Sequence, residues 1–161
     1  MSNNKYGEFD SAEELNQAAA GQLEQGDHEA LFEIAAENGI DKEDAQDYID
    51  GNAPVLATPL MAAFGKLDVE NKELKLTEIM DDWLNYIRIQ CQENHAMCTA
   101  VRRKGKSLAG CIGTILKWSF TNKYSVQQSI VEAASGVPGN VQMGIPGMKQ
   151  AKQLINDYYL R

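Results

Sequence analysis

The chain has 161 residues, of which 43% are hydrophobic and 24% are charged, and its formal net charge is −8. This length and composition predict one globular domain, or one domain with a small appended module, that buries a real core. No apolar run approaches the ~20 residues of a membrane-spanning helix, so we expect no membrane partner. The N-terminus has neither a basic start nor an apolar stretch, and the three cysteines are an odd, widely spaced set. Both features are typical of a cytoplasmic protein with reduced thiols.

Charge is distributed unevenly along the sequence. Residues 1–54 hold 14 acidic residues against Lys5 and Lys42, which gives this part a net charge of −12. Residues 55–161 hold the other 9 acidic residues and 13 basic ones, a net charge of +4. Such asymmetry favours one part that repels nucleic acid and one that attracts it. The alternative is two solvated faces without a partner.

The sequence of residues 1–54 predicts three short helices that carry most of the acid. A capping box of Ser11 and Glu14 opens the first helix, whose apolar residues share one face. Asp27 begins the second helix, Asp41 begins the third, and a glycine ends each of the first two. We therefore predict an acidic three-helix module here, followed by a hinge at the sequence GNAP.

The sequence of residues 55–161 predicts a second, basic-leaning helical domain. Thr58 and the proline after it are a strong helix start. Thr77 caps the longest predicted helix, and Ser107 and Ser125 begin two more. A final helix is predicted over the sequence MKQAKQLINDYYL.

The segment before the final helix is rich in glycine and proline. Within it Val141 and Gln142 favour a short strand, but no second strand signal pairs with it. The whole pattern predicts a mostly α protein, a compact bundle of about six to eight short helices with an acidic N-terminal helical module. The apolar face of the helix that begins at Ser107 is predicted to consist of Leu108, Cys111, Ile112, Ile115, Leu116 and Phe120.

A cluster of positive charge lies just before that helix. Arg102, Arg103, Lys104 and Lys106 place four cations within five positions, and Ser107 follows as the predicted helix N-cap. The free N–H groups and the dipole at a helix N-terminus favour an anion, and the cations reinforce that preference. The segment therefore suggests binding of a phosphate or an acidic partner; the alternative is a solvated loop between two helices.

Two further lysines, Lys149 and Lys152, follow a glycine-proline turn. The sequence GIPGMKQAKQLI is similar to the glycine hairpin of helix-hairpin-helix DNA binders, whose backbone amides contact phosphate. In that arrangement both lysines lie near the phosphate. The alternative is a plain loop followed by a helix start, because proline and glycine punctuate loops of every kind.

No set of residues predicts catalysis or a cofactor. Cys91, His95 and Cys98 are spaced to share one helix face, with Cys111 further on, and three cysteines with one histidine are a legitimate zinc set. No Cys-x-x-Cys knuckle is present, however, and cysteine also behaves as a small buried hydrophobe. No Ser-His-Asp order or pair of carboxylates stands out. We therefore expect a protein that is not an enzyme and holds neither metal nor cofactor.

Three stretches between Ile79 and Ala134 carry a resemblance to a known family. IMDDWLNYIRIQCQENHAMCTAV resembles the opening helix and following short helix of the PcfK-like family, small proteins of conjugative elements from Gram-positive and gut bacteria. GKSLAGCIGTIL is similar to that family's segment of lysine, serine and a hydrophobe before a cysteine and an apolar pair. YSVQQSIVEAA is similar to its last helix. The resemblance implies a protein of a phage, plasmid or other mobile genetic element that works in the cytoplasm of a bacterial host cell.

The resemblance also implies a function. Members of the family include inhibitors of the effector nuclease of type II CRISPR systems, which holds nucleic acid in a positively charged channel. An anti-CRISPR inhibitor with an acidic module can bind that nuclease or its guide-RNA complex and block DNA binding or cleavage. The alternative is a nucleic-acid-binding accessory of plasmid or transposon transfer that holds DNA or RNA through residues 102–106. For the inhibitor, the candidate contacts are Glu13, Glu14, Glu24, Asp27, Glu29, Glu33, Glu37, Asp44 and Asp47.

Overall fold

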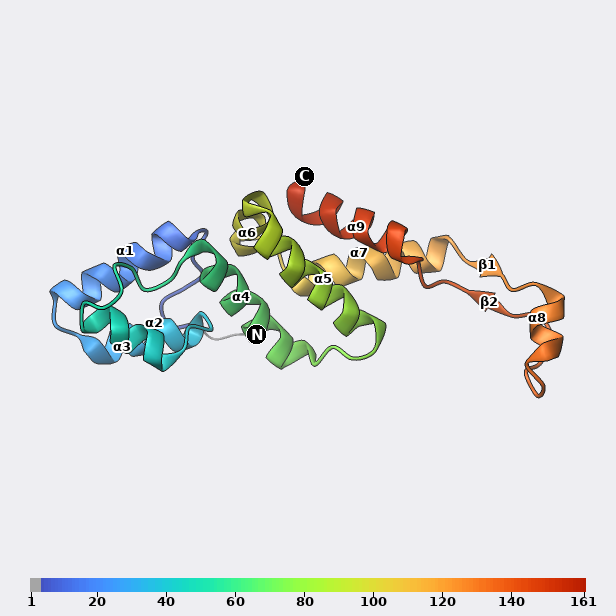
Figure 1. The fold of residues 1–161 in the computed structure, drawn as a ribbon, viewed down its shortest axis with the longest axis horizontal. Coiled ribbons are helices and arrows are strands. Elements are labelled where there is room, and N and C mark those ends of the chain that lie inside the picture. The colour runs from blue at the N-terminus through green and yellow to red at the C-terminus, as the bar shows by residue number, and fades with distance from the viewer. Residues whose placement is uncertain (1–3) are drawn as a thin grey trace.

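Nine helices and one short two-stranded ribbon make up the part of the chain that the structure describes. The structure is a computed structural model that describes residues 4–161, and Figure 1 shows an elongated arrangement that narrows into an arm. The mostly α fold predicted from the sequence is confirmed. Within residues 4–161, no helix combines the length and the apolar character that crossing a membrane requires. In chain order the elements are α1 (Ala12–Glu24), α2 (His28–Glu37), α3 (Lys42–Ile49), α4 (Pro59–Leu74), α5 (Ile79–Glu93), α6 (His95–Arg102), α7 (Leu108–Thr121), β1 (Tyr124–Ser125), α8 (Gln128–Ala133), β2 (Gln142–Met143) and α9 (Met148–Leu160).

Helices α1, α2 and α3 pack around a core of their own. Leu31 of α2 and Leu56 of the connection to α4 are buried in it. The Glu14 N–H donates to the Ser11 hydroxyl oxygen at 3.1 Å, and the Asp10 N–H donates to the Glu14 carboxylate at 2.8 Å. The Ser11 half of the predicted capping box is therefore present, whereas Glu14 accepts from the residue before the N-cap instead of from Ser11 itself.

Helix α4 belongs to both halves of the molecule. Ala62 packs in the first core, whereas its neighbour Ala63 packs in a second core formed mainly by α4, α5, α6, α7 and α9. Leu84, Ile115 and Ile155 are fully buried in this second core. The predicted division after residue 54 lies in the connection between α3 and α4, so the two predicted parts share the packing surface of α4.

The end of α2 and the middle of α4 touch through their backbones. Gly39 has a φ of +69°, and a Cβ added there would collide with the backbone of Gly65. A Cβ added to Gly65 would in turn collide with the carbonyl oxygen of Asn38. Only glycine permits this approach, which sets Asn38 against the second half of the molecule.

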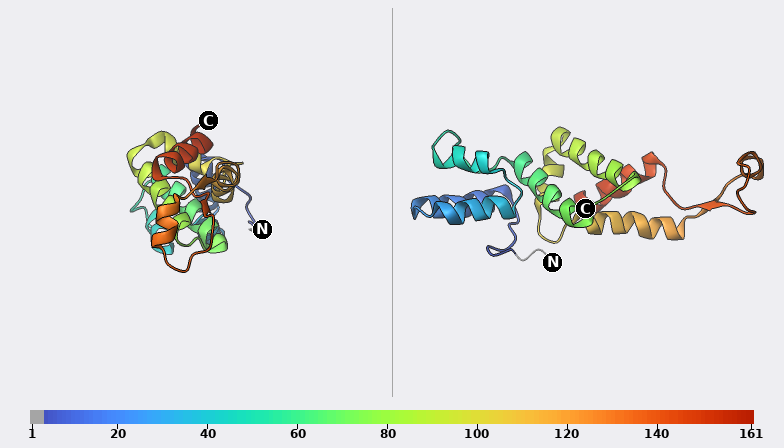
Figure 2. Two further views of the ribbon diagram at one scale, coloured as in Figure 1. Left: turned by 90° about the vertical axis from the view of Figure 1, so that its right-hand side faces the viewer. Right: turned by 90° about the horizontal axis from the view of Figure 1, so that it is seen from below.

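The segment of residues 122–147 leaves the body as an arm (Figures 1 and 2). Strands β1 and β2 pair antiparallel, with Tyr124 opposite Met143, and α8 lies between them at the far end. Ser125 was predicted to cap the helix of this segment, but it lies in β1 and Gln127 is the N-cap of α8. A ribbon of two residue pairs is too short to leave a periodic signal in the sequence.

Four other predicted details are wrong. The strand expected at Val141 and Gln142 is displaced by one residue and has β1 as its partner. The helix expected to begin after Thr77 has Glu78 as its N-cap, and α4, with 16 residues, is longer than α5, with 15. Leu116 and Phe120 are exposed, because the second core covers α7 only as far as Ile115.

Candidate functional site

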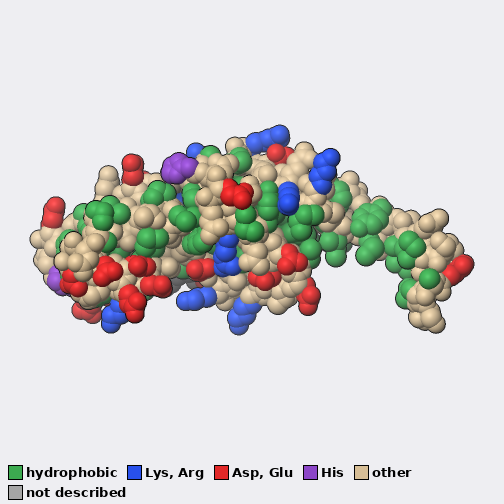
Figure 3. Space-filling model, in the orientation of Figure 1, with side chains coloured by type: hydrophobic (Ala, Val, Ile, Leu, Met, Phe, Trp, Pro, Cys, Tyr) green, Lys and Arg blue, Asp and Glu red, His purple; other side chains and the backbone are tan. Residues whose placement is uncertain are grey.

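The acidic surface consists of carboxylates on the outside of α1, α2 and α3. In Figure 3 acidic side chains gather over the part of the molecule that these helices form. Glu33 forms an ion pair with Lys5 at 2.8 Å, and the hydrogen bond from Lys5 lowers the pKa of Glu33. Glu13, Glu14, Glu24, Asp27, Glu29 and Asp47 are exposed, whereas Glu33, Glu37 and Asp44 are partly buried.

Most of these carboxylates lack a basic partner. Glu14 and Asp27 accept backbone N–H groups at the starts of helices, and Glu37 accepts from the backbone N–H of Lys5 at 2.8 Å. In the described part of the chain, the other candidates have no side-chain hydrogen bond or ion pair. These unpaired carboxylates are Glu13, Glu24, Glu29, Asp44 and Asp47.

The basic loop, residues 102–106, is tied into the fold at its first residue. The side chain of Arg102 is buried, with 4% of the residue exposed, and its Nη2 donates to Asn38 Oδ1 at 2.6 Å. Asn38 Nδ2 donates to the carbonyl oxygen of Ile34 at 2.8 Å, which fixes the orientation of the amide. Arg102 therefore joins α6 to the end of α2 and points into the fold.

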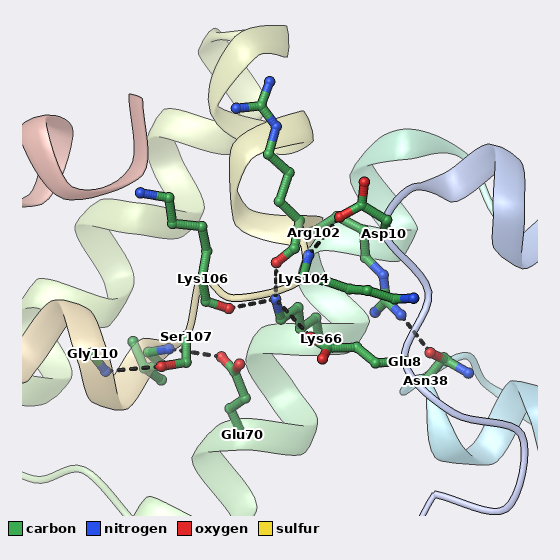
Figure 4. A network of polar contacts seen from close by, with 12 residues as sticks. Glu8, Asp10, Asn38, Lys66, Glu70, Arg102, Lys104, Lys106, Ser107 and Gly110 are labelled. Atoms are coloured by element: carbon green, nitrogen blue, oxygen red, sulfur yellow. Dashed lines mark hydrogen bonds and ion pairs between the residues drawn. The ribbon is translucent and has the colours of Figure 1, made fainter. Parts of the chain in front are cut away.

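Lys66 of α4 holds the backbone of the basic loop (Figure 4). Its Nζ donates to the carbonyl oxygens of Arg103, at 2.8 Å, and Lys106, at 2.6 Å, and lies 3.6 Å from a carboxylate oxygen of Glu8. Lys66 is 7% exposed, so these oxygens replace the water that its ammonium group loses. A cation from another helix thus holds the backbone of the loop, in addition to the contact that the loop's own Arg102 makes.

The N-terminus of α7 already has an anionic partner. The Ser107 hydroxyl accepts from the Gly110 N–H at 3.0 Å, as its predicted role as N-cap requires. A carboxylate oxygen of Glu70 accepts from the Leu108 N–H at 3.0 Å. Glu70 thus supplies from within the chain the negative charge that a helix N-terminus favours.

The remaining cations of the basic loop differ in their surroundings. Lys106 Nζ donates to the carbonyl oxygen of Tyr158 at 2.6 Å and lies 4.9 Å from the centroid of its ring. The backbone N–H of Lys104 donates to Asp10 Oδ1 at 2.8 Å, but the side chain of Lys104 is exposed. The Arg103 side chain is exposed as well. The loop therefore presents two unengaged cations, Arg103 and Lys104.

The charges beneath the basic loop balance one another. Two cations, Lys66 and Arg102, lie among two carboxylates, Glu8 and Glu70. Burial lowers the pKa of Lys66 and of Arg102, and the two carboxylates oppose both shifts. Burial raises the pKa of Glu70, against the effect of the nearby Lys66 charge and of the hydrogen bond from the helix N-terminus. This composition is that of a structural polar cluster.

The two lysines after the glycine-proline turn lie at the start of α9. Lys149 and Lys152 are exposed, and Lys152 Nζ lies 5.3 Å from the centroid of the Tyr86 ring. Gly147 is the N-cap of α9, and the element before it is β2. The segment is therefore not a helix-hairpin-helix, because its first member is a strand.

The three cysteines contribute to the second core. Cys91, Cys98 and Cys111 are buried there, and Cys98 Sγ donates to the carbonyl oxygen of Cys91 at 2.8 Å. Burial raises the pKa of Cys91 and of Cys111 to about 12. His95 lies at the exposed start of α6. Across residues 4–161, no three His, Cys, Asp or Glu side chains are grouped to hold a metal ion.

Sequence reasoning missed the groups that hold the basic loop in place. They come from four separate segments, the N-terminal segment, the end of α2, α4 and α9, and each is a common residue type that local sequence patterns do not single out. Only the position of Ser107 as an N-cap indicated that a polar partner would lie nearby. The missed residues are Glu8, Asp10, Asn38, Lys66, Glu70 and Tyr158.

A comparison of the chain with protein-family models, with curated proteins and with solved structures finds no match. The resemblance of residues 79–134 to PcfK-like proteins remains a hypothesis.

Proposed function

We propose that this protein is a non-enzymatic, protein-binding regulator that docks its acidic surface on a positively charged surface of another protein. One observation carries the proposal: five carboxylates of α1–α3 have no partner within the described part of the chain, whereas the basic loop has only two unengaged cations, Arg103 and Lys104. Unengaged charge of one sign on a folded surface attracts a partner of the other sign.

The excess of negative charge determines which partners this surface attracts and how binding depends on salt. Residues 1–54 hold 14 acidic residues against two basic ones, and the carboxylates project from helices that a core of their own holds in place. Such a surface speeds encounter with a basic groove and discriminates against acidic partners. Because exposed charges are screened by salt, binding is expected to weaken as ionic strength rises.

For the partner we propose the effector nuclease of a type II CRISPR system, alone or with its guide RNA. Its nucleic-acid channel is positively charged and of the right kind to accept an acidic surface. The resemblance of residues 79–134 to PcfK-like proteins supports this choice, since inhibitors of that nuclease occur among them. Occupation of the channel blocks DNA binding or cleavage, which is the action of an anti-CRISPR protein of a mobile genetic element.

The test compares two pairs of charge reversals near the C-terminal ends of helices. Glu24→Lys with Asp47→Lys removes two unpaired carboxylates of α1 and α3. The control, Glu73→Lys with Glu93→Lys, changes the net charge equally at the ends of α4 and α5. The measurement is inhibition of DNA cleavage by a guide-loaded type II effector nuclease. We expect at least a ~10-fold weaker inhibitor from the first pair and little change from the control.

Two results would contradict this proposal. One is equal inhibition by both double variants, which would mean that the acidic surface makes no specific contact. The other is salt-sensitive binding of labelled DNA or RNA by the wild-type chain that is lost in Arg103→Ser with Lys104→Ser. Steep loss with salt is the signature of phosphate contacts, and it would favour a nucleic-acid-binding accessory of plasmid or transposon transfer.

A further inference from the structure

The exposed large hydrophobic side chains are concentrated in one region. Twelve such residues occur in the described part of the chain, and eight of them lie between positions 116 and 148. Figure 3 shows apolar side chains along the narrow arm and at its root. The most exposed are Phe120 at 68%, Ile130 at 58% and Leu116 at 57%. The eight are Leu116, Phe120, Tyr124, Ile130, Val137, Met143, Ile145 and Met148.

The arm has little to stabilise it within its own chain. Its ribbon consists of two residue pairs, and α8 has six residues, of which Val131 alone is buried. An isolated two-stranded ribbon is marginally stable in water, and so is a helix of this length. The arm therefore needs further apolar contacts to hold the conformation that it shows.

A groove at the root of the arm provides a second apolar surface. It has a volume of about 340 Å³ and lies between α5, α7 and the segment that returns from β2. Met80, Trp83, Leu116 and Phe120 contribute to its apolar lining. Gly144 forms part of its edge, and a Cβ there would lie 2.6 Å from the carbonyl oxygen of Ser119. The segment after β2 therefore packs closely against the backbone of α7.

We propose that a second copy of this chain covers this surface, with the arm of each copy lying on the groove of the other. A two-fold axis through the middle of the paired arms brings the tip of one arm, with Ile130, to the root of the other. Such an interface is self-complementary and closes as a dimer. The proposal is independent of the proposed function, because it uses the end of the molecule away from α1–α3 (Figure 1).

Charge favours a second copy at this surface. Each chain carries a net charge of −8, so two copies repel one another as whole molecules. Residues 112–148 carry only Lys117, Lys123 and Glu132, which makes them nearly neutral. This is the region where two acidic chains can meet without opposing like charges.

The size of the apolar surface also fits a dimer. Eight large side chains that are about half exposed present on the order of 600 Å² of apolar surface, the upper end for a patch on a monomer. A standard interface takes about 800 Å² from each partner, including its polar rim. One copy thus has enough apolar surface in this region for a stable interface.

Sedimentation equilibrium of the full-length chain over a concentration series tests the proposal. We expect a mass twice the 17.8 kDa of one chain. Phe120→Glu is expected to raise the dissociation constant at least ~30-fold, the effect of losing a central apolar anchor. Ile89→Glu, at an exposed isoleucine of α5 outside the groove, is the matched control and should leave the mass unchanged. Circular dichroism confirms that both variants are folded.

A cross-link tests the exchange of arms directly. Chains with Ile130→Cys are mixed with chains with Leu116→Cys, and a disulfide between the two is expected on oxidation. Chains with Ile89→Cys in place of Leu116→Cys should give none. A wild-type chain that stays monomeric at ~0.5 mM, a dimer that Phe120→Glu leaves intact, or equal cross-linking at position 89 would each overturn the proposal.

Discussion

The acidic surface and the basic loop carry opposite charges, but they differ in how they are built. The basic loop is held by Lys66, Asp10 and its own buried Arg102, and a carboxylate occupies the helix N-terminus that follows it. The acidic surface has five carboxylates that make no such contact. A run of charge in a sequence is therefore a weak guide to a binding surface until the partners of its polar groups are known.

The comparison also explains how a chain of net charge −8 holds four cations in one loop. Two of them, Arg102 and Lys106, bond to oxygen atoms of Asn38 and Tyr158. Buried cations are stable only where such oxygens replace water. The loop thus acts as a connector between α6 and α7 that α4 and the N-terminal segment hold in place, and only its exposed cations are free to meet another molecule.

A substitution at the contact between the end of α2 and α4 is expected to cause the largest loss of stability. In Gly65→Ala the new methyl group would collide with the carbonyl oxygen of Asn38, and backbone on both sides would have to move. We expect a loss of at least ~3 kcal/mol in the free energy of unfolding, measured by urea denaturation. Gly113→Ala in α7, where the added Cβ meets nothing within 4 Å, is the control and should gain up to ~1 kcal/mol. Similar losses in the two variants would show that the close approach does not matter.

Removal of the hydrogen bonds from Lys66 to the basic loop is expected to cause the second-largest loss of stability. Lys66→Met keeps most of the apolar stem but leaves two carbonyl oxygens without this donor and removes one of the two cations beside Glu8 and Glu70. We expect a loss of about 2–3 kcal/mol in unfolding free energy and faster amide hydrogen exchange in residues 103–106. Lys72→Met, at an exposed position of the same helix, should change neither. If exchange in the loop is unaltered, the loop is held by some other contact.

The fold could be predicted from the sequence where it depends on local signals. The N-cap at Ser11, the proline start of α4 and the N-cap at Ser107 each act within a few residues, and all three are present. The burial of Arg102 was not predictable, because it depends on Asn38, 64 positions away, and on a backbone contact that two glycines allow. The exposure of Phe120 escaped prediction for a similar reason: helical periodicity shows which residues share a face, but not where the covering helices end.

The balance of charge beneath the basic loop predicts a smaller, pH-dependent effect. Burial raises the pKa of Glu70 above the ordinary value of 4.5. In the window above 4.5 the native state binds more protons than the unfolded state, so this group's contribution to stability falls as pH rises. Glu70→Gln keeps an acceptor for the Leu108 N–H and removes the titration. Its unfolding free energy relative to wild type, measured by urea denaturation at a series of pH values, should therefore rise across this window. An NMR titration of the Glu70 carboxyl with a midpoint below 4.5 would contradict this.

Substitutions at the acidic surface are expected to have the smallest effect on stability. The size of this effect shows whether the carboxylates stabilise the fold or are available for a partner. Glu24→Gln with Asp47→Asn removes two carboxylates that have no partner in the fold and lie near helix C-terminal ends, where negative charge is unfavourable. We expect the free energy of unfolding to stay within about 0.5 kcal/mol of wild type, with a rise rather than a fall. Thermal and urea unfolding at low and high salt measure this, and the difference should shrink at high salt because the repulsion is screened. A loss above ~1 kcal/mol would mean that the carboxylates stabilise the helices themselves. Unpaired charge that costs the fold a little stability is the pattern expected of residues whose partner lies on another molecule.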